Sequence, residues 1–213
     1  MTKRKITIAA VGITLVVLTA IVALLWTQCG TRGHDKREKQ GNYWVIDHPT
    51  PNITPGRNRV QGVVLHHTAT FRIQDALGGL CSPKRQVSCH ALIDRDGTRY
   101  ILASPDKITH HAGNSMLDGK AWCNKFTIGI EFQGNTCNRP LTEAQINSAI
   151  DYLLPIIRKY GIPINKIVTH QQVRDNWLSA HPDRKDVPAK VDITPAEHQR
   201  FIQALKARLQ AGK

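Results

Sequence analysis

The sequence predicts an α/β fold: a single domain with a central mixed β-sheet flanked by helices, preceded by one transmembrane helix. Three observations lead to this prediction. Short apolar runs bounded by turn residues, such as VVL and TIGIEF, are typical of buried strands. Longer segments with apolar residues at helical spacing alternate with these runs, as in an α/β domain. An uninterrupted apolar stretch stands apart from both patterns, near the N-terminus.

The N-terminal apolar stretch is long enough to span a membrane. Ile6–Trp26 contains no charged residue. At about 1.5 Å per residue, a helix of this length crosses a hydrocarbon core of roughly 30 Å. A cleavable signal peptide has an apolar core of only about 7–15 residues, and no small-x-small cleavage site follows this stretch. We therefore expect residues 1–26 to be an uncleaved membrane anchor, with a cleaved signal as the alternative.

Residues 27–57 are expected to form a polar linker. The run GTRGHDKREKQGN is polar and charged, and HPTPNITPG is rich in proline. Between these runs, YWVIDH is expected to be a short edge strand or a segment that packs onto the domain. The folded domain is therefore predicted to cover residues 58–213.

The elements of that domain follow one another in order. VVLHHTA predicts a strand, TFRIQDALGGL a helix, and VSCHALIDRDGTRYIL a hairpin that turns at an Asp-Gly pair. FTIGIEFQGN predicts another buried strand. LTEAQINSAIDYLLPIIRKYG predicts an amphipathic helix that Thr142 caps and Gly161 ends. INKIVTHQQV predicts a short strand that ends in His170, and TPAEHQRFIQALKARLQ predicts a closing helix that begins at a Thr-Pro pair.

Four of the five cysteines lie within this domain: Cys81, Cys89, Cys123 and Cys137. They lack a tight CxxC spacing, so a structural zinc knuckle is not expected. In an exported protein they would form two disulfides. Of the three possible connectivities we favour the nearest neighbours, Cys81–Cys89 and Cys123–Cys137. Four reduced, partly buried thiols are the alternative for a cytoplasmic domain.

The formal net charge of +13 predicts an acidic partner. The basic residues are scattered and the aromatic residues are few, so no nucleic-acid-binding module is recognised and nucleic acid is not expected as a partner. Together with a membrane anchor, the charge favours an anionic envelope polymer or a lipid surface.

The ends of the predicted strands carry side chains that can bind metal ions or take part in catalysis. They are His66 and His67 in VVLHHTA, His111 in HHAGNS, Glu131 after the apolar IGI, and His170 at the end of KIVTH. Ligands commonly bind at the carboxyl ends of sheet strands. Imidazole is the commonest protein ligand for metals and suits zinc. Burying an ionised carboxylate in a strand such as this costs on the order of several kcal/mol of folding free energy unless it is paired or hydrogen-bonded.

These segments resemble the zinc-dependent N-acetylmuramoyl-L-alanine amidases, the family that includes phage lysozyme amidases and peptidoglycan recognition proteins. The resemblance covers about Val60 to Asp192. It is carried by VVLHHTAT, VSCHALIDRDGTRYIL, HHAGNS, FTIGIEFQGN and IVTHQQV, which occur in the family's order. Each segment is weak evidence alone, whereas five in order are a specific signal.

The resemblance implies a set of zinc ligands. His66 would be the first ligand and His170 the second. Asp192 would be the third, two residues after a catalytic Lys190. Asp192 lies farther from His170 than is usual in the family, so the intervening RDNWLSAHPDRKDVPA would be an insertion. Asp186, which lies nearer but lacks the Lys-x-Asp spacing, is the alternative ligand.

The resemblance also implies how the reaction would proceed. Glu131 would take a proton from a zinc-activated water and pass it to the leaving amine. Lys190 would stabilise the developing oxyanion. A glutamate here matches the branch of the family that uses a carboxylate base, and Cys89 stands where the tyrosine of the other branch would fall. His111 and Asn114 would contact the substrate.

The expected function is therefore cleavage of the amide between N-acetylmuramic acid and the L-alanine of the stem peptide, with Zn²⁺ as cofactor. Peptidoglycan or a muropeptide would be the substrate. The protein would act as a monomer in the cell envelope, anchored to the membrane with its catalytic domain outside the cytoplasm. A non-catalytic peptidoglycan-binding module with a decayed site is the alternative. His90 is expected in the hairpin core, hydrogen-bonded and not bound to metal, and the role of His67 is left open.

Overall fold

The computed structural model describes residues 36–184 and 192–212. Its main element is a seven-stranded mixed sheet. The strands, in their order across the sheet, are β1 (Arg37–Gln40), β2 (Tyr43–Asp47), β6 (Arg99–Ile101), β5 (Ala91–Ile93), β10 (Thr127–Phe132), β4 (Gly62–His67) and β11 (Ile167–Thr169). The four strands from β5 to β11 run parallel to one another, whereas β6 is antiparallel to β5 and β1 to β2. The predicted α/β class with a central mixed sheet is confirmed.

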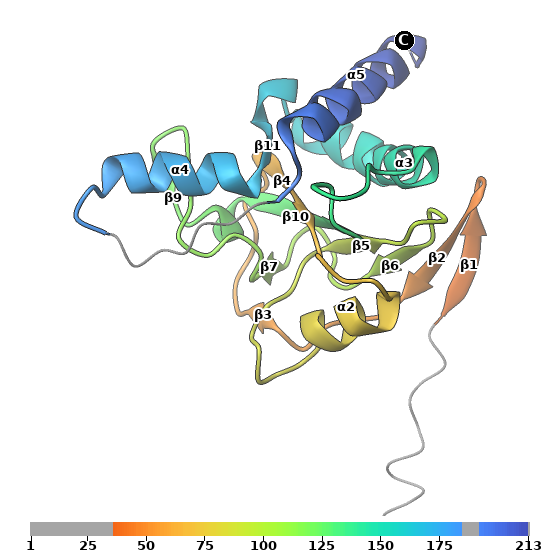
Figure 1. Cartoon of the computed structure of the whole chain (residues 1–213), viewed down its shortest axis with the longest axis horizontal. Helices are drawn as coiled ribbons and strands as arrows, with labels where there is room; N and C mark the ends of the chain where they lie inside the picture. The colour runs from red at the N-terminus through yellow and green to blue at the C-terminus, as the bar shows by residue number, and fades with distance from the viewer. Residues whose placement is uncertain (1–35, 185–191, 213) are drawn as a thin grey trace, which may run out of the picture. The chain divides into compact units, whose positions relative to one another are not determined.

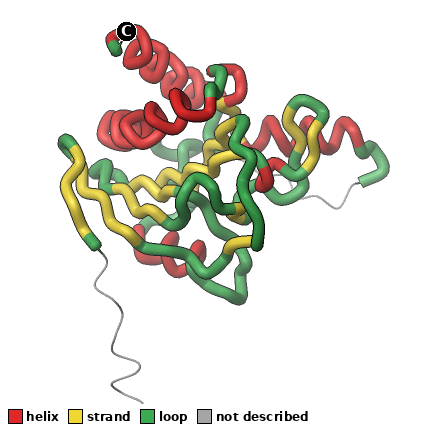
Figure 2. The backbone as a smooth tube through the Cα atoms, turned by 180° about the vertical axis from the view of Figure 1, so that it is seen from behind, coloured by secondary structure: helices red, strands yellow, loops and turns green. Residues whose placement is uncertain are grey.

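Helices cover both faces of the sheet. Helices α3 (Glu143–Tyr160) and α5 (Pro195–Ala211) lie together on one face, and α2 (Ile73–Leu80) lies on the other (Figure 1). Seen from behind, the strands run between the helix pair and α2 (Figure 2). Helix α4 (His170–Ala180) follows β11. It packs Val173 into a cluster with Val64 of β4, on the face away from α3 and α5.

The core follows from the alternation of side chains along the central strands. Val63 and Leu65 of β4 face the cluster made with α3 and α5, whereas Val64 faces the cluster made with α4. Successive side chains of a strand point to opposite faces, so a strand covered on both sides reads as a continuous apolar run. All six residues of β4 are buried, including the two histidines at its end.

The predicted helix signals are confirmed. Thr142 and Gln145 form a reciprocal capping box at the start of α3, and Gly161 ends the helix in the left-handed conformation. Thr194 caps α5, and Pro195 occupies its first turn. The predicted hairpin is the antiparallel pair β5–β6. Shorter elements complete the domain: the two-stranded sheets β3–β7 (Ile53–Thr54, Ile108–Thr109) and β8–β9 (Met116–Leu117, Lys120–Ala121), and the 3₁₀ turns Cys123–Lys125 and Ile164–Lys166.

The structure corrects the extent of the predicted linker. Within residues 27–57, the part from residue 37 onward forms β1, β2 and β3, and β2 pairs in parallel with β6. The compact unit accordingly begins at Arg37, not at residue 58. YWVIDH is therefore an inner strand of the sheet, with β1 as the edge strand.

The segment after β11 also differs from the prediction. The expected strand INKIVTHQQV ends at Thr169, and its last residues begin α4. Thr169 accepts a hydrogen bond from the backbone N–H of Gln172, whose side chain in turn accepts from the backbone N–H of Thr169. This capping box starts a helix directly at His170. The sequence between His170 and Asp192, expected to be an insertion, thus begins with α4.

The expected transmembrane helix cannot be compared with the structure. The membrane anchor expected over residues 1–26 lies outside the described residues. Within residues 36–184 and 192–212, no helix combines the length and hydropathy needed to span a bilayer.

The predicted disulfides are wrong, because Cys81, Cys89, Cys123 and Cys137 are all free thiols. Cys123 is buried beneath β4 and α4, whereas Cys137 is exposed, and the thiol of Cys89 contacts the carbonyl of Ala91.

Candidate metal centre

The predicted site residues lie where three parallel strands end. His66 is near the end of β4, Glu131 near the end of β10, and His170 directly follows β11. Glu131 lies opposite His66 in the β4–β10 register. Paired residues of neighbouring strands project from the same face of a sheet. The imidazole and the carboxylate therefore start from adjacent positions, on the face that α3 and α5 do not cover.

The third member of the site comes from the segment that precedes α5. Ile193 is buried in the main core, and Thr194 is the cap of the helix. These two anchors place the Asp192 side chain against the strand ends. Its Oδ1 accepts a hydrogen bond from the backbone N–H of His67 at 2.9 Å. Its Oδ2 lies 3.1 Å from His170 Nδ1 and 3.7 Å from His66 Nδ1.

His66, His170 and Asp192 can together hold a metal ion. Their candidate ligand atoms lie within 4.8 Å of one another, and all three side chains are buried. Burial raises the pKa of the Asp192 carboxyl, but the electrostatic influence of the neighbouring His170 and His66 lowers it more, so the carboxylate stays ionised. A buried carboxylate requires a positive partner. Two imidazole nitrogens and one carboxylate oxygen facing one point are the donor set of a cation.

A chain of hydrogen bonds sets the tautomer of His66. The carbonyl of Cys123 can only accept, so the Thr127 hydroxyl donates to it, at 2.7 Å. The Thr127 oxygen is then left to accept from Nε2 of His111, at 3.3 Å. Burial, and then the neighbouring histidines, lower the pKa of His111 well below its usual value, so its ring is neutral and its Nδ1 accepts. That Nδ1 lies 3.2 Å from His66 Nε2, which therefore carries the proton. His66 Nδ1 is left as a lone-pair donor facing Asp192.

His67 has a different role from His66. Its Nδ1 accepts a hydrogen bond from the backbone N–H of Thr136 at 3.1 Å and also contacts the Thr136 hydroxyl. That hydroxyl donates to the backbone carbonyl of Asp192 and accepts from the backbone N–H of Thr194. Through Thr136, His67 therefore helps to hold the segment that carries Asp192 against the end of the sheet.

A cleft of about 310 Å³ opens beside the three converging side chains. Glu131, His111 and Asp192 line it together, along with the loop that follows β4. A carboxylate in an open cleft next to a cation site can accept a proton from a bound water and return it to a leaving group. The arrangement has the parts needed for hydrolysis.

The remaining predicted residues divide into three groups. Lys190 and the alternative ligand Asp186 lie outside the described residues. Asn114 is half-buried and is not among the described residues that line the cleft. His111 lines the cleft, but both of its ring nitrogens contact protein atoms, which indicates that it orients His66. His90 is buried and hydrogen-bonded, as expected.

Two threonines of the site carry no signal in the sequence. Thr127 begins β10 and Thr136 follows that strand, and each looks like an ordinary strand or loop residue. Their importance depends on partners far away in the chain, namely His111, His67 and Asp192. The adjacent imidazoles in HHTA are the one pattern that could have suggested such supports.

Comparisons with known proteins agree with this geometry. A family model described as N-acetylmuramoyl-L-alanine amidase matches residues 56–190. The 1,6-anhydro-N-acetylmuramyl-L-alanine amidase AmpD of Enterobacter cloacae is 34% identical over 102 residues, which cover 48% of this chain and 50% of the relative. AmpD of Haemophilus influenzae is 38% identical over 125 residues, covering 57% of this chain and 60% of the relative. The match thus spans only about half to three-fifths of these relatives.

Solved structures show the same fold. The crystal structure of a selenomethionine derivative of AmpD superposes with a TM-score of 0.57 at 24% identity, covering 75% of this chain and 92% of the other. The family match extends over more than half of the chain and includes the strand ends that carry His66, Glu131 and His170. The chain belongs to the N-acetylmuramoyl-L-alanine amidase family.

Proposed function

We propose that this protein is a zinc-dependent hydrolase that cleaves the amide between N-acetylmuramic acid and the L-alanine of the stem peptide. The convergence of His66, His170 and Asp192, next to an open cleft that Glu131 and Asp192 line, carries the proposal. Two imidazoles and one carboxylate are a typical ligand set for catalytic zinc, because they leave a coordination position open. Family membership and the names of the AmpD relatives support the same reaction.

In this proposal the chain's own residues position and move protons. Bound zinc supplies a Lewis acid that acidifies water and polarises a carbonyl. Glu131 takes the proton of the attacking water and delivers it to the nitrogen of L-alanine as the amide bond breaks. Lys190, as the resemblance implies, donates to the oxyanion. His111 and Thr127 hold His66 as a lone-pair donor throughout.

The experiment is an assay of the full-length protein, loaded with zinc, on intact peptidoglycan, on muropeptides and on their 1,6-anhydro forms. We expect new L-alanine amino termini, detected by mass spectrometry, and loss of the activity with a chelator. Glu131→Gln should lower kcat by about 10²–10⁴-fold, the usual contribution of a general base, with zinc content unchanged. Zinc-loaded protein that leaves all of these substrates uncut would contradict the proposal.

Asp192→Ala separates the enzyme from a non-catalytic binding module. We expect this variant to lose both zinc and activity. Asp175→Ala, which removes an exposed aspartate on α4, is the control and should retain both. If the wild type binds peptidoglycan without cutting it, and Asp192→Ala binds equally well, the alternative of a binding module with a decayed site is correct.

We further propose that the protein acts as a monomer in the cell envelope, held to the membrane by residues 1–26. The apolar stretch Ile6–Trp26 and the net charge of +13 support this proposal. Membrane fractionation, with protease added to intact and to lysed cells, tests it. The domain should sediment with membranes and be degraded only once the protease reaches the outer side of the cytoplasmic membrane.

A further inference from the structure

A second cavity, of about 160 Å³, adjoins the catalytic cleft. Ala69 and Thr70, in the loop after β4, line both, so this loop is the ridge between them. The other residues that line the second cavity are Phe71, Arg95, Gln133, Gly134, Asn135, Asn138 and Arg139. A substrate held in the catalytic cleft, beside Glu131 and Asp192, therefore has a neighbouring cavity into which one of its arms can extend.

The second cavity is positively charged. Two arginines and three side-chain amides line it, and no acidic side chain is among its described lining residues. Arg95 and Arg139 both line this cavity of about 160 Å³, so their positive charges share a small space. Burial, and then the charge of Arg139, lower the pKa of Arg95. The acidic groups near Arg95, Asp94 and Glu197, are not part of the lining. An anion between the two arginines would relieve their mutual repulsion.

The two arginines differ in how they are held. Arg95 Nη1 donates to the backbone carbonyl of Pro140 at 2.9 Å and lies 3.4 Å from Gln145 Oε1, so its guanidinium is fixed. The exposed side chain of Arg139 forms no hydrogen bond or ion pair with the residues that the structure describes. Its guanidinium is thus available to a ligand. A fixed arginine beside a free one can bind a carboxylate, because guanidinium geometry matches that of carboxylate oxygens.

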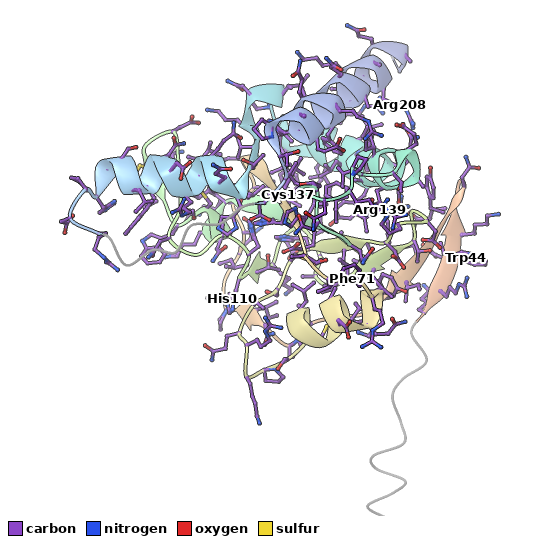
Figure 3. The ribbon with its side chains drawn as sticks, viewed as in Figure 1. Trp44, Phe71, His110, Cys137, Arg139 and Arg208 are labelled. Atoms are coloured by element: carbon purple, nitrogen blue, oxygen red, sulfur yellow. The ribbon has the colours of Figure 1, made fainter. Side chains whose placement is uncertain are left out.

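Phe71 forms an aromatic wall of the same cavity. Its side chain is 99% exposed, although it is large and apolar. Phe71 and Arg139 lie near each other between α2 and α3 (Figure 3). The loop that carries Phe71 is held firmly: the backbone N–H of Ala69 donates to Gly134, and Gln133 donates to the Thr70 carbonyl. Ala69 has a φ of 54°, a strained value for a residue with a side chain.

We propose that the second cavity is a subsite for a carboxylate-bearing residue of the stem peptide, beyond L-alanine. This inference rests on the proposed amidase function. The muramyl sugar has no free carboxylate once its lactyl group is in amide linkage, whereas the residues after L-alanine do. The pair Arg95–Arg139 therefore selects the peptide arm of the substrate, and Phe71 packs against its aliphatic part.

A matched pair of substrates tests the subsite. N-acetylmuramyl-L-alanyl-D-glutamate and N-acetylmuramyl-L-alanyl-D-isoglutamine share the scissile amide and differ by one carboxylate. We expect the full-length, zinc-loaded wild type to prefer the glutamate compound in kcat/KM. Arg139→Gln should reduce that preference by about tenfold, mainly through KM, as expected for a charge-assisted hydrogen bond. Phe71→Ala should weaken binding of both compounds alike.

Arg59→Gln is the control, because it removes the same charge from an exposed arginine that precedes β4, at the end of the strand away from His66. It should leave the preference unchanged. Equal loss of activity on both compounds in Arg139→Gln, or no preference in the wild type, would overturn the subsite. If the wild type cleaves neither compound and also leaves peptidoglycan, muropeptides and their 1,6-anhydro forms uncut, the proposed function fails. Calorimetric binding of the same pair to the wild type and to Arg139→Gln then decides the subsite by itself.

Discussion

At the scale of single residues, hydrogen bonds that end on backbone carbonyls determine which nitrogen of each buried imidazole carries a proton. The chain from Cys123 through Thr127 and His111 does so for His66. His90 is set in the same way, because its Nε2 lies 3.0 Å from the carbonyl of Lys107 and its Nδ1 accepts from the backbone N–H of Gly129. Carbonyls can only accept, so the contacts alone assign the proton of His90, whereas the assignment for His66 also uses the neutral ring of His111.

Thr127→Val should weaken zinc binding although Thr127 is not a ligand. Valine has nearly the same shape but leaves His111 free to reverse its tautomer, which would place a proton on His66 Nδ1. Loss of such a supporting hydrogen bond typically costs 10–100-fold in metal affinity. Competition with a chelating indicator measures the affinity, and nitrogen NMR of the metal-free protein reports the tautomer.

Two control variants show whether the loss of zinc affinity comes from the Thr127 hydroxyl. Thr127→Ser keeps the hydroxyl and should bind zinc as the wild type does. Thr109→Val removes a hydroxyl that contacts His90, away from the ligands, and should have no effect on zinc. Wild-type zinc affinity in Thr127→Val would show that the hydrogen-bond chain does not control His66.

His90 should make the stability of the fold depend on pH. Burial lowers its pKa from 6.5 to about 4, although the Lys107 carbonyl and Asp106 oppose the shift. Between these values the unfolded chain binds a proton that the folded protein does not, so stability falls as the pH drops from 6.5 towards 4 and is constant above 6.5. The loss attributable to His90 is on the order of 3 kcal/mol.

Urea unfolding of the metal-free protein at pH 7.5 and pH 4.5 measures this effect. The free energy of unfolding should decrease less between the two pH values in His90→Gln than in the wild type, whatever the starting stability of the variant. A half-buried histidine of α5, His198, whose Nε2 lies 2.8 Å from the carbonyl of Ile167, provides a control substitution, His198→Gln. Equal decreases in the wild type and in His90→Gln would exclude His90 as the titrating group.

At the scale of elements, the strength of the buried pattern decided what could be predicted. Strands β4 and β10 and helix α3 bury continuous or helically spaced apolar residues, and their sequences indicated them. Helix α4 buries only His170, Val173 and Trp177, so its apolar periodicity is weak. All four residues of β1 are exposed. Such a strand forms through pairing with β2, which no local pattern reveals.

Two glycines of different elements should respond in opposite ways to alanine. In β10, a Cβ on Gly129 would lie 2.4 Å from Cγ of the buried His111. Gly129→Ala should therefore displace that ring, cost about 1–3 kcal/mol as overpacking does, and weaken zinc binding. In α2, nothing lies within 4 Å of a Cβ on the exposed Gly78. Gly78→Ala should stabilise the protein by about 0.5–1 kcal/mol.

Thermal unfolding, followed by circular dichroism, compares the two variants with the wild type. Zinc titration supplies the second measurement, in which Gly78→Ala should equal the wild type. If Gly129→Ala has the same unfolding temperature and zinc affinity as the wild type, neither property depends on the position of the His111 ring beside β10.

At the scale of the whole molecule, the sequence pointed to the three candidate ligands but not to the residues that support them. His66 and His170 end apolar runs, and the family resemblance singled out Asp192, which the structure places beside both. The hydrogen bonds of Thr136 and Thr127 join segments that are distant in the chain. They depend on the tertiary arrangement, so a single sequence does not reveal them.

The domain boundary yields the last prediction. β2 pairs with β6, and the guanidinium of Arg99 in β6 donates to the side chain of Gln40 in β1. Thr50 and Asn52, farther along the same segment, hydrogen-bond to the carbonyl of Leu80 at the end of α2. A fragment of residues 36–213 should therefore unfold cooperatively and bind zinc. A fragment of residues 58–213 would leave one edge of β6 unpaired, and should unfold at a lower temperature or aggregate. Calorimetry and zinc titration of the two fragments measure this difference, and equal stability would mean that residues 37–57 are a linker after all.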